Sequence, residues 1–120
     1  FHNNGKLRAK GSYIKGNKNG NWLTFFNNGN IRSQEAYVEG IKSGVWKFYY
    51  RSGNIRTEEE YKDNNLEGIW RFYLETGELV ESGYQKNGVR DGALEIFDKQ
   101  GELIKKETWV MGVLTGVELY

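Results

Sequence analysis

The sequence predicts an all-β fold, an elongated antiparallel meander of β-hairpins that repeat with a 24-residue period. The first observation is that all 16 glycines fall into four columns when they are sorted by the remainder of their residue number on division by 24. The second is that aromatic and aliphatic positions recur at the same spacing, and the third is that no stretch shows a sustained helical period. Glycine reaches positive φ without steric cost, so glycines at fixed offsets indicate turns at fixed offsets.

The repeating unit is clearest between Gly44 and Gly68, which enclose VWKFYYRSGNIRTEEEYKDNNLE. A shift of 24 residues in either direction places Trp22 and Trp70 on Trp46. The 120 residues hold five periods without an insertion, so we expect a single repeat domain over residues 1–120. Because the chain begins and stops inside a period, we also expect it to be a fragment of a longer protein.

Each unit is expected to begin with a tight turn such as Asn27-Asn28-Gly29, a type I turn followed by glycine in a bulge position. Residues 1–5 follow the same pattern. A strand should come next, over 6–14, 30–38, 54–62, 78–86 and 102–110. Ile31 and Tyr37 have the same parity and should share one face of the sheet.

The opposite, wetter face is expected to carry residues of the other parity, which include Arg32, Arg56, Glu58 and Glu60.

A Gly-x-x-x-Gly segment such as 40–44 is interpreted as the longer connection, which leads to a strand in which Trp46 and Phe48 alternate with polar residues. These strands should hold the core. Nine or ten strands spaced by roughly 4.8 Å would extend about 45 Å. In the fourth unit Tyr84 stands one position before its column, where Gln85 sits, which predicts a bulge or a slip in register.

Composition limits the chemistry. The net charge of +1 comes from 17 basic and 16 acidic residues, so no global field favours nucleic acid or an anionic membrane. The chain has no cysteine, and its single histidine, His2, is expected to be an exposed strand-end residue. We therefore predict no catalytic residue, no metal site and no cofactor. No apolar run reaches the length of a membrane-spanning helix.

Two motifs that could suggest catalysis have simpler interpretations. The Gly-x-x-x-Gly segments lack the Gly-Lys-Ser/Thr of a phosphate-binding loop. The acidic run of Glu58, Glu59 and Glu60 could supply paired carboxylates for glycoside hydrolysis, but such a pair needs a cleft that a plain repeat does not predict. Solvated charge, or cross-strand pairing with Arg32 and Arg56, is the favoured interpretation.

A second aromatic row is the candidate binding surface. Its parity is opposite to that of the tryptophans, and it consists of Phe25, Tyr49, Tyr73 and Phe97, flanked by Lys47 and Arg71. An exposed row of rings beside cations could bind a peptide, a sugar or another sheet. The alternative is that a twisted or two-sided ribbon buries these rings as well.

The pattern Gly-x-Trp-x-x-[Phe/Tyr]-x-x-x-Gly-x-[Ile/Leu], followed by Tyr and Gly-x-x-x-Gly, resembles the MORN repeat, and more closely its bacterial variant. The resemblance covers the whole chain but loses Trp in the last two units. It implies one β-hairpin per repeat and an elongated sheet that serves as a scaffold. Similar bacterial chains are labelled as antitoxins of toxin–antitoxin systems, and similar repeats accompany lipid kinases, a label that the repeat alone can spread. The repeat residues are structural, so the resemblance supplies no catalytic residue.

These features predict a non-enzymatic repeat scaffold that binds a protein partner, antitoxin-like, through its sheet face or an exposed end strand. The alternative is a surface-binding module for lipid head groups or glycans that uses the aromatic row. Edge strands could also pair with a second copy of the chain. Nucleic acid is not an expected partner, and a membrane surface is not favoured. The compartment stays open: a bacterial protein whose leader was removed could be secreted or lie in the cell envelope.

Overall fold

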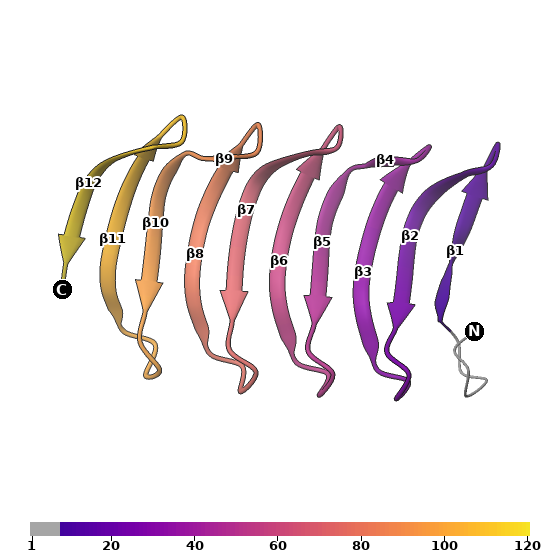
Figure 1. Ribbon diagram of the computed structural model, residues 1–120, viewed down its shortest axis with the longest axis horizontal. Coiled ribbons are helices and arrows are strands. Elements are labelled where there is room, and N and C mark those ends of the chain that lie inside the picture. Colours follow the sequence, from indigo (N-terminus) through magenta and orange to yellow (C-terminus); the bar gives the residue numbers. More distant parts are fainter. Residues whose placement is uncertain (1–7) are drawn as a thin grey trace.

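A computed structural model describes residues 8–120, and in this range every regular element is a β-strand. The turn predicted within residues 1–5 and His2 lie outside the described residues. Ten strands form one continuous antiparallel sheet in the order β1-β2-β3-β5-β6-β7-β8-β10-β11-β12, while the two-residue strands β4 and β9 pair with β3 and β8 (Figure 1). The strands are β1 (Ala9–Ile14), β2 (Asn17–Phe25), β3 (Ile31–Val38), β4 (Ile41–Lys42), β5 (Gly44–Tyr49), β6 (Ile55–Lys62), β7 (Asn65–Tyr73), β8 (Leu79–Lys86), β9 (Val89–Arg90), β10 (Gly92–Phe97), β11 (Leu103–Val110) and β12 (Val113–Leu119).

The turns along the lower edge of the sheet in Figure 1, called here the lower turns, have the predicted form. The Gly29 N–H donates to the Phe26 carbonyl (3.0 Å), and the Phe26 N–H donates to the Asn30 carbonyl (2.8 Å). Gly29 adopts a φ of 92°, whereas neither asparagine before it has a positive φ. The same two bonds recur in the three following lower turns. A turn closed by a left-handed glycine matches the right-handed twist of the strands that it joins.

The turns along the upper edge in Figure 1, called here the upper turns, contain the Gly-x-x-x-Gly segments. They differ from the prediction, because these segments are not long connections. Lys15 and Gly16 both have positive φ, at 51° and 83°, and Ile14 pairs directly with Asn17. This is a two-residue hairpin turn, so the residues between the two glycines already belong to the next strand. The second glycine, Gly20, has a φ of 78° inside β2.

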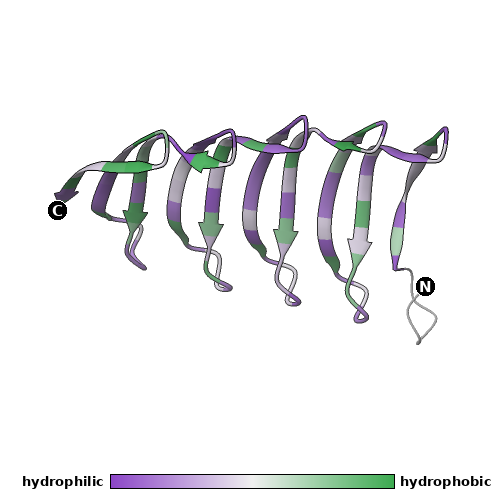
Figure 2. Cartoon of the chain, turned by 45° about the horizontal axis from the view of Figure 1, so that its top comes forward, coloured by the Kyte–Doolittle hydropathy of each residue, from purple (hydrophilic) through white to green (hydrophobic). Residues whose placement is uncertain are grey.

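The column of Gly20 marks a bend in the sheet. At the equivalent Gly68, the pairing of β6 with β7 jumps from Glu59↔Trp70 to Tyr61↔Leu66. Three residues of β7 then face a single residue of β6, which bends the longer strand. As a result, the upper hairpins lie at an angle to the strands below them (Figure 2). The sheet measures 49 × 32 × 16 Å, and its longest dimension agrees with the predicted 45 Å.

A bulge near each lower turn corrects the predicted faces. Phe25 pairs with Ile31 and Thr24 pairs with Ser33, which leaves Arg32 as the additional residue. The Arg32 Nε–H donates to Thr24 Oγ1 (3.2 Å), so this guanidinium lies on the side of the tryptophans and not on the predicted wetter face. The extra residue also shifts the alternation of side chains along β3, so Ile31 and Tyr37 do not share a face as predicted. Strict parity was wrong here because it cannot register a bulge.

The slip predicted at Tyr84 is absent. Gly68 pairs with Gln85 just as Gly44 pairs with Tyr61 one unit earlier, so the column register is kept. Tyr84 is exposed. The tyrosine at position 84, one residue before its column, is therefore a substitution, and the backbone register is unchanged.

The core is a single row on one side of the sheet, named here the Trp face, which carries Trp22, Trp46 and Trp70. Trp22 and Trp46 are 6% and 4% exposed, and Leu94 continues the row at 3%. One layer of strands buries each ring only against its neighbours in the row. Among the described residues, no helix is long and apolar enough to cross a membrane.

Candidate functional site

Aromatic rings and cations alternate along the Trp face, on the inside of the bend. The Tyr37 ring lies edge-on to Trp46, with centroids 5.1 Å apart, and Tyr61 lies on the other side of Trp46 at 5.3 Å. The Lys42 Nζ lies 4.8 Å from the Trp46 ring and 5.0 Å from the Tyr61 ring. Rings from the upper and lower parts of a unit can meet this closely only if the sheet bends toward the Trp face. This face is therefore the inner, concave side.

Carboxylates anchor the tyrosines of this face. The Tyr37 hydroxyl donates to Glu35 Oε1 (2.8 Å), and the Tyr61 hydroxyl donates to Glu59 Oε2 (2.9 Å). Burial, together with the carboxylate beside the hydroxyl, raises the pKa of Tyr61 to about 12, and the same causes raise the pKa of Tyr37. Both phenols are therefore neutral donors at physiological pH and are poor candidates for acid–base chemistry.

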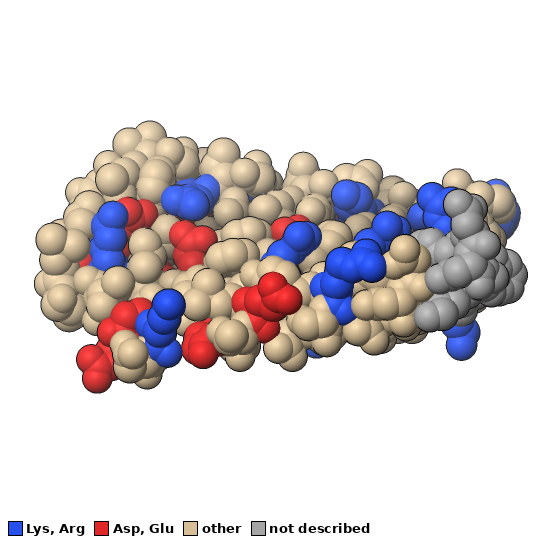
Figure 3. All heavy atoms as spheres, turned by 60° about the horizontal axis from the view of Figure 1, so that its bottom comes forward, with Lys and Arg blue, Asp and Glu red and all other residues tan. Residues whose placement is uncertain are grey.

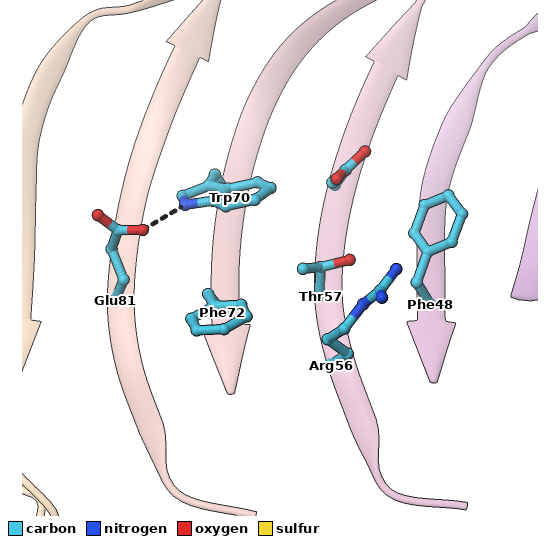
Figure 4. Close-up of a pocket in the computed structure, with 7 residues that line it drawn as sticks. Phe48, Arg56, Thr57, Trp70, Phe72 and Glu81 are labelled. Atoms are coloured by element: carbon cyan, nitrogen blue, oxygen red, sulfur yellow. Dashed lines mark hydrogen bonds between the residues drawn. The ribbon is translucent and has the colours of Figure 1, made fainter. Parts of the chain in front are cut away.

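A hollow of about 510 Å³ opens on the Trp face between β5 and β8 (Figure 4). Its lining combines three aromatic rings with three charged groups and a hydroxyl: Phe48, Arg56, Thr57, Glu59, Trp70, Phe72 and Glu81. Figure 4 shows the Trp70 and Phe72 rings on one side and Phe48 with the Arg56 side chain on the other. Apolar walls with a few polar groups are typical of a binding site.

Trp70 departs from the other tryptophans of the Trp face. The indole N–H groups of Trp22 and Trp46 donate to main-chain carbonyls, those of Ser12 and Ala36. The indole of Trp70 donates instead to Glu81 Oε2 (3.1 Å). Trp70 is only half-buried. Its ring therefore forms a wall of the hollow and is less buried than the rings of Trp22 and Trp46.

The predicted aromatic row lies on the opposite side of the sheet and is half-buried. The Tyr73 hydroxyl donates to Glu58 Oε1 (2.6 Å), while the Tyr49 hydroxyl makes a longer contact with Gln34 Oε1 (3.4 Å). The flanking Arg71 lies 3.7 Å from the same Glu58 oxygen. Phe25, Phe97 and Lys47 are half-buried as well. The row is thus on the predicted side of the sheet, but its tyrosine hydroxyls already have partners.

The acidic run has different partners from those predicted. Glu58 contacts Tyr73 and Arg71. Glu60 Oε1 accepts a hydrogen bond from the Ile69 N–H (3.2 Å) and occupies the space beside Gly68. Cross-strand pairing with Arg32 and Arg56 was wrong, because the bulges turn both guanidiniums to the Trp face. Among the described residues, no group of three or more acidic or histidine side chains could hold a metal ion.

Charge is distributed unevenly along the sheet. Residues 1–60 hold 10 of the 17 basic residues and 5 of the 16 acidic residues. Figure 3 shows the consequence on one face: basic side chains prevail toward the N-terminal end, and acidic side chains gather over the C-terminal half. The hollow lies at the transition, and its lining carries both signs of charge.

A protein-family model described as MORN repeat variant matches residues 1–15, 18–39, 42–63 and 66–87. The chain belongs to this family. MORN repeats are modules that bind proteins or membranes and are not catalytic domains. The match ends at residue 87, and beyond it the Trp column holds Leu94 in the fourth unit and Glu118 in the fifth. No curated protein matches the chain significantly.

Parity reasoning missed the hollow. Arg56 was assigned to the other face, and Thr57 and Glu81 were not singled out. One signal was available in the MORN columns: the position of Lys18 and Lys42 is Leu66 in the third unit, four residues before Trp70, which lines the hollow.

Proposed function

We propose that this MORN protein is a non-enzymatic recognition module that binds a protein partner along its Trp face. The hollow between β5 and β8 supports this most directly. It offers aromatic walls for apolar contact and charged groups for orientation, the combination by which interfaces anchor a few partner side chains. An antitoxin-like role, in which the partner is a toxin, is one form of this proposal.

A pair of matched variants tests which face binds. Phe48→Ala with Phe72→Ala removes two walls of the hollow, and Tyr49→Ala with Tyr73→Ala removes two rings of the opposite row. Both baits should be used in pull-downs from native lysate, followed by titration of the purified partner. We expect the first pair to abolish the complex and the second to retain it. The proposal fails if a folded first variant binds the partner as tightly as the wild type.

The lipid or glycan alternative depends on the aromatic row on the other side. Two contacts argue against it: Glu58 partly neutralises Arg71, and the same carboxylate occupies the Tyr73 hydroxyl. Binding to anionic vesicles or to a glycan array that is lost in Tyr49→Ala with Tyr73→Ala would establish this alternative. Pairing of a second copy along the outer strands β1 and β12 stays a prediction.

A further inference from the structure

Three of the four tryptophans carry a cation supplied by the chain itself. The Lys18 Nζ lies 4.9 Å from the Trp22 ring, the Lys42 Nζ lies 4.8 Å from the Trp46 ring, and the Arg90 Cζ lies 5.2 Å from the Trp109 ring. These three cations occupy a single column of the repeat. A cation over an indole ring is attracted by its electron-rich face. A basic side chain over the indole ring is therefore a recurring neighbour of tryptophan in this sheet.

Trp70 is the exception. The cation column holds Leu66 in this unit, and among residues 8–120 no Lys or Arg lies over the Trp70 ring. The ring is nevertheless half-buried beside the hollow, so one side of it is accessible. The hollow therefore contains the aromatic part of a cation site without the cation.

Carboxylates complete the cation site. Glu59 accepts one hydrogen bond, from Tyr61, whereas its counterpart Glu35 accepts two, from Tyr37 and from Ser33 Oγ (2.7 Å). One Glu59 oxygen thus has no donor among the described residues. Glu81 accepts the Trp70 indole N–H and is 3.8 Å from Arg90, whose side chain is 40% exposed. A cation at Trp70 would meet both carboxylates, and charge-assisted hydrogen bonds are the strong ones.

Arg56 shows that the occupant is more than a bare cation. Its counterpart Arg32 donates to Thr24, but Phe48 stands in the column of that threonine, so Arg56 loses this acceptor. Arg56 makes no hydrogen bond or ion pair with the residues that the structure describes. Figure 4 places it beside Phe48, across the hollow from Trp70. The site therefore presents acceptors at one end and a donor at the other.

We propose that this hollow receives a lysine or arginine side chain from an extended polypeptide, with the cation over Trp70 between Glu59 and Glu81 and a main-chain carbonyl at Arg56. The inference rests on the proposed function for its partner, a protein, and it specifies the side chain that the partner inserts. A peptide carries both the cation and the adjacent acceptor, which fits the two ends of the hollow.

The test uses the whole chain labelled with ¹⁵N and two probes, acetyl-Gly-Lys-Gly-amide and the same peptide with norleucine in place of lysine. The lysine peptide should shift the Trp70 indole N–H signal in a saturable way and leave the other three indole signals in place. Norleucine should bind about tenfold more weakly, because it keeps the apolar stem and lacks the charge. Equal affinity for the two peptides would overturn the proposal.

Four variants sharpen the result. Leu66→Lys restores the cation of the column and should compete for Trp70, while Glu81→Gln keeps a side chain that can accept the indole N–H but removes the charge. Each should weaken the lysine peptide about tenfold, and Glu95→Gln, on the opposite face, should leave it unchanged. If Arg56→Ala tightens binding, Arg56 fills the hollow itself and the proposed role for its guanidinium is wrong.

The outcomes separate the two proposals. If the protein partner binds Leu66→Lys and Glu81→Gln with wild-type affinity, the proposed function stands and the cation site fails. If the lysine peptide binds but no protein partner requires the Trp face, the cation site stands and the proposed function fails. Binding of phosphatidylcholine vesicles at Trp70 in preference to the lysine peptide would replace the peptide by a lipid head group and overturn the assignment.

Discussion

Replacing Trp46 by alanine should remove a large part of the stability of this MORN sheet. The ring is 4% exposed, lies between Tyr37 and Tyr61, carries Lys42, and donates its indole N–H to the Ala36 carbonyl. Truncating a buried aromatic residue to alanine costs about 3–5 kcal/mol. A chain of this length is stable by roughly 6–18 kcal/mol. We therefore expect a loss of about 4 kcal/mol.

Urea unfolding followed by far-UV circular dichroism measures this loss. With a slope of about 2 kcal/mol/M, the midpoint should fall by about 2 M. Trp46→Phe is the matched control, because it keeps a six-membered aromatic ring and removes the pyrrole part of the indole together with its N–H. The Ala36 carbonyl still accepts from the Ser43 N–H (3.1 Å), so this variant should lose about 1–2 kcal/mol. A loss below about 1.5 kcal/mol in Trp46→Ala would refute the view that the row of rings is the core.

Three further predictions concern packing, pH and the opposite face. Gly83→Ala should destabilise the fold by about 1–3 kcal/mol, because a Cβ there would lie 2.5 Å from Leu94 Cδ1, whereas Gly116→Ala, with 3.8 Å to its nearest neighbour, should be nearly neutral in the same urea assay. The pKa of Tyr61 is about 12 in the folded state and about 10 in the unfolded state, so its contribution to the free energy of unfolding is complete below pH 10 and is lost as pH rises toward 12. Tyr61→Phe lacks this contribution. Its urea midpoint should therefore fall less between pH 9 and 11 than that of the wild type. Tyr73→Phe should cost about 1–2 kcal/mol in thermal unfolding, because it removes a 2.6 Å bond to a half-buried carboxylate, and no measurable loss would mean that this bond is not formed in solution.

The sequence alone determined the repeat, the strands and the lower turns. Glycines at a constant offset can be explained only by turns at a constant offset, and Gly29 and its equivalents have the positive φ that this requires. Four of the strands that follow these turns, β3, β6, β8 and β11, begin within one residue of the prediction. These features depend on local backbone preferences, which each unit repeats independently.

The tertiary structure alone decided which side chains share a face. Parity assigned Arg56 to the wetter side, but the bulge at the lower turn brings it into the hollow with Trp70. Likewise, the glycines of the upper segments mark a tight turn and a bend, and the bend determines which side of the sheet is concave. A single extra residue between paired strands reverses the alternation beyond it, and that residue is defined by its partner strand. The candidate site is therefore a property of the pairing between units, because no single unit contains it.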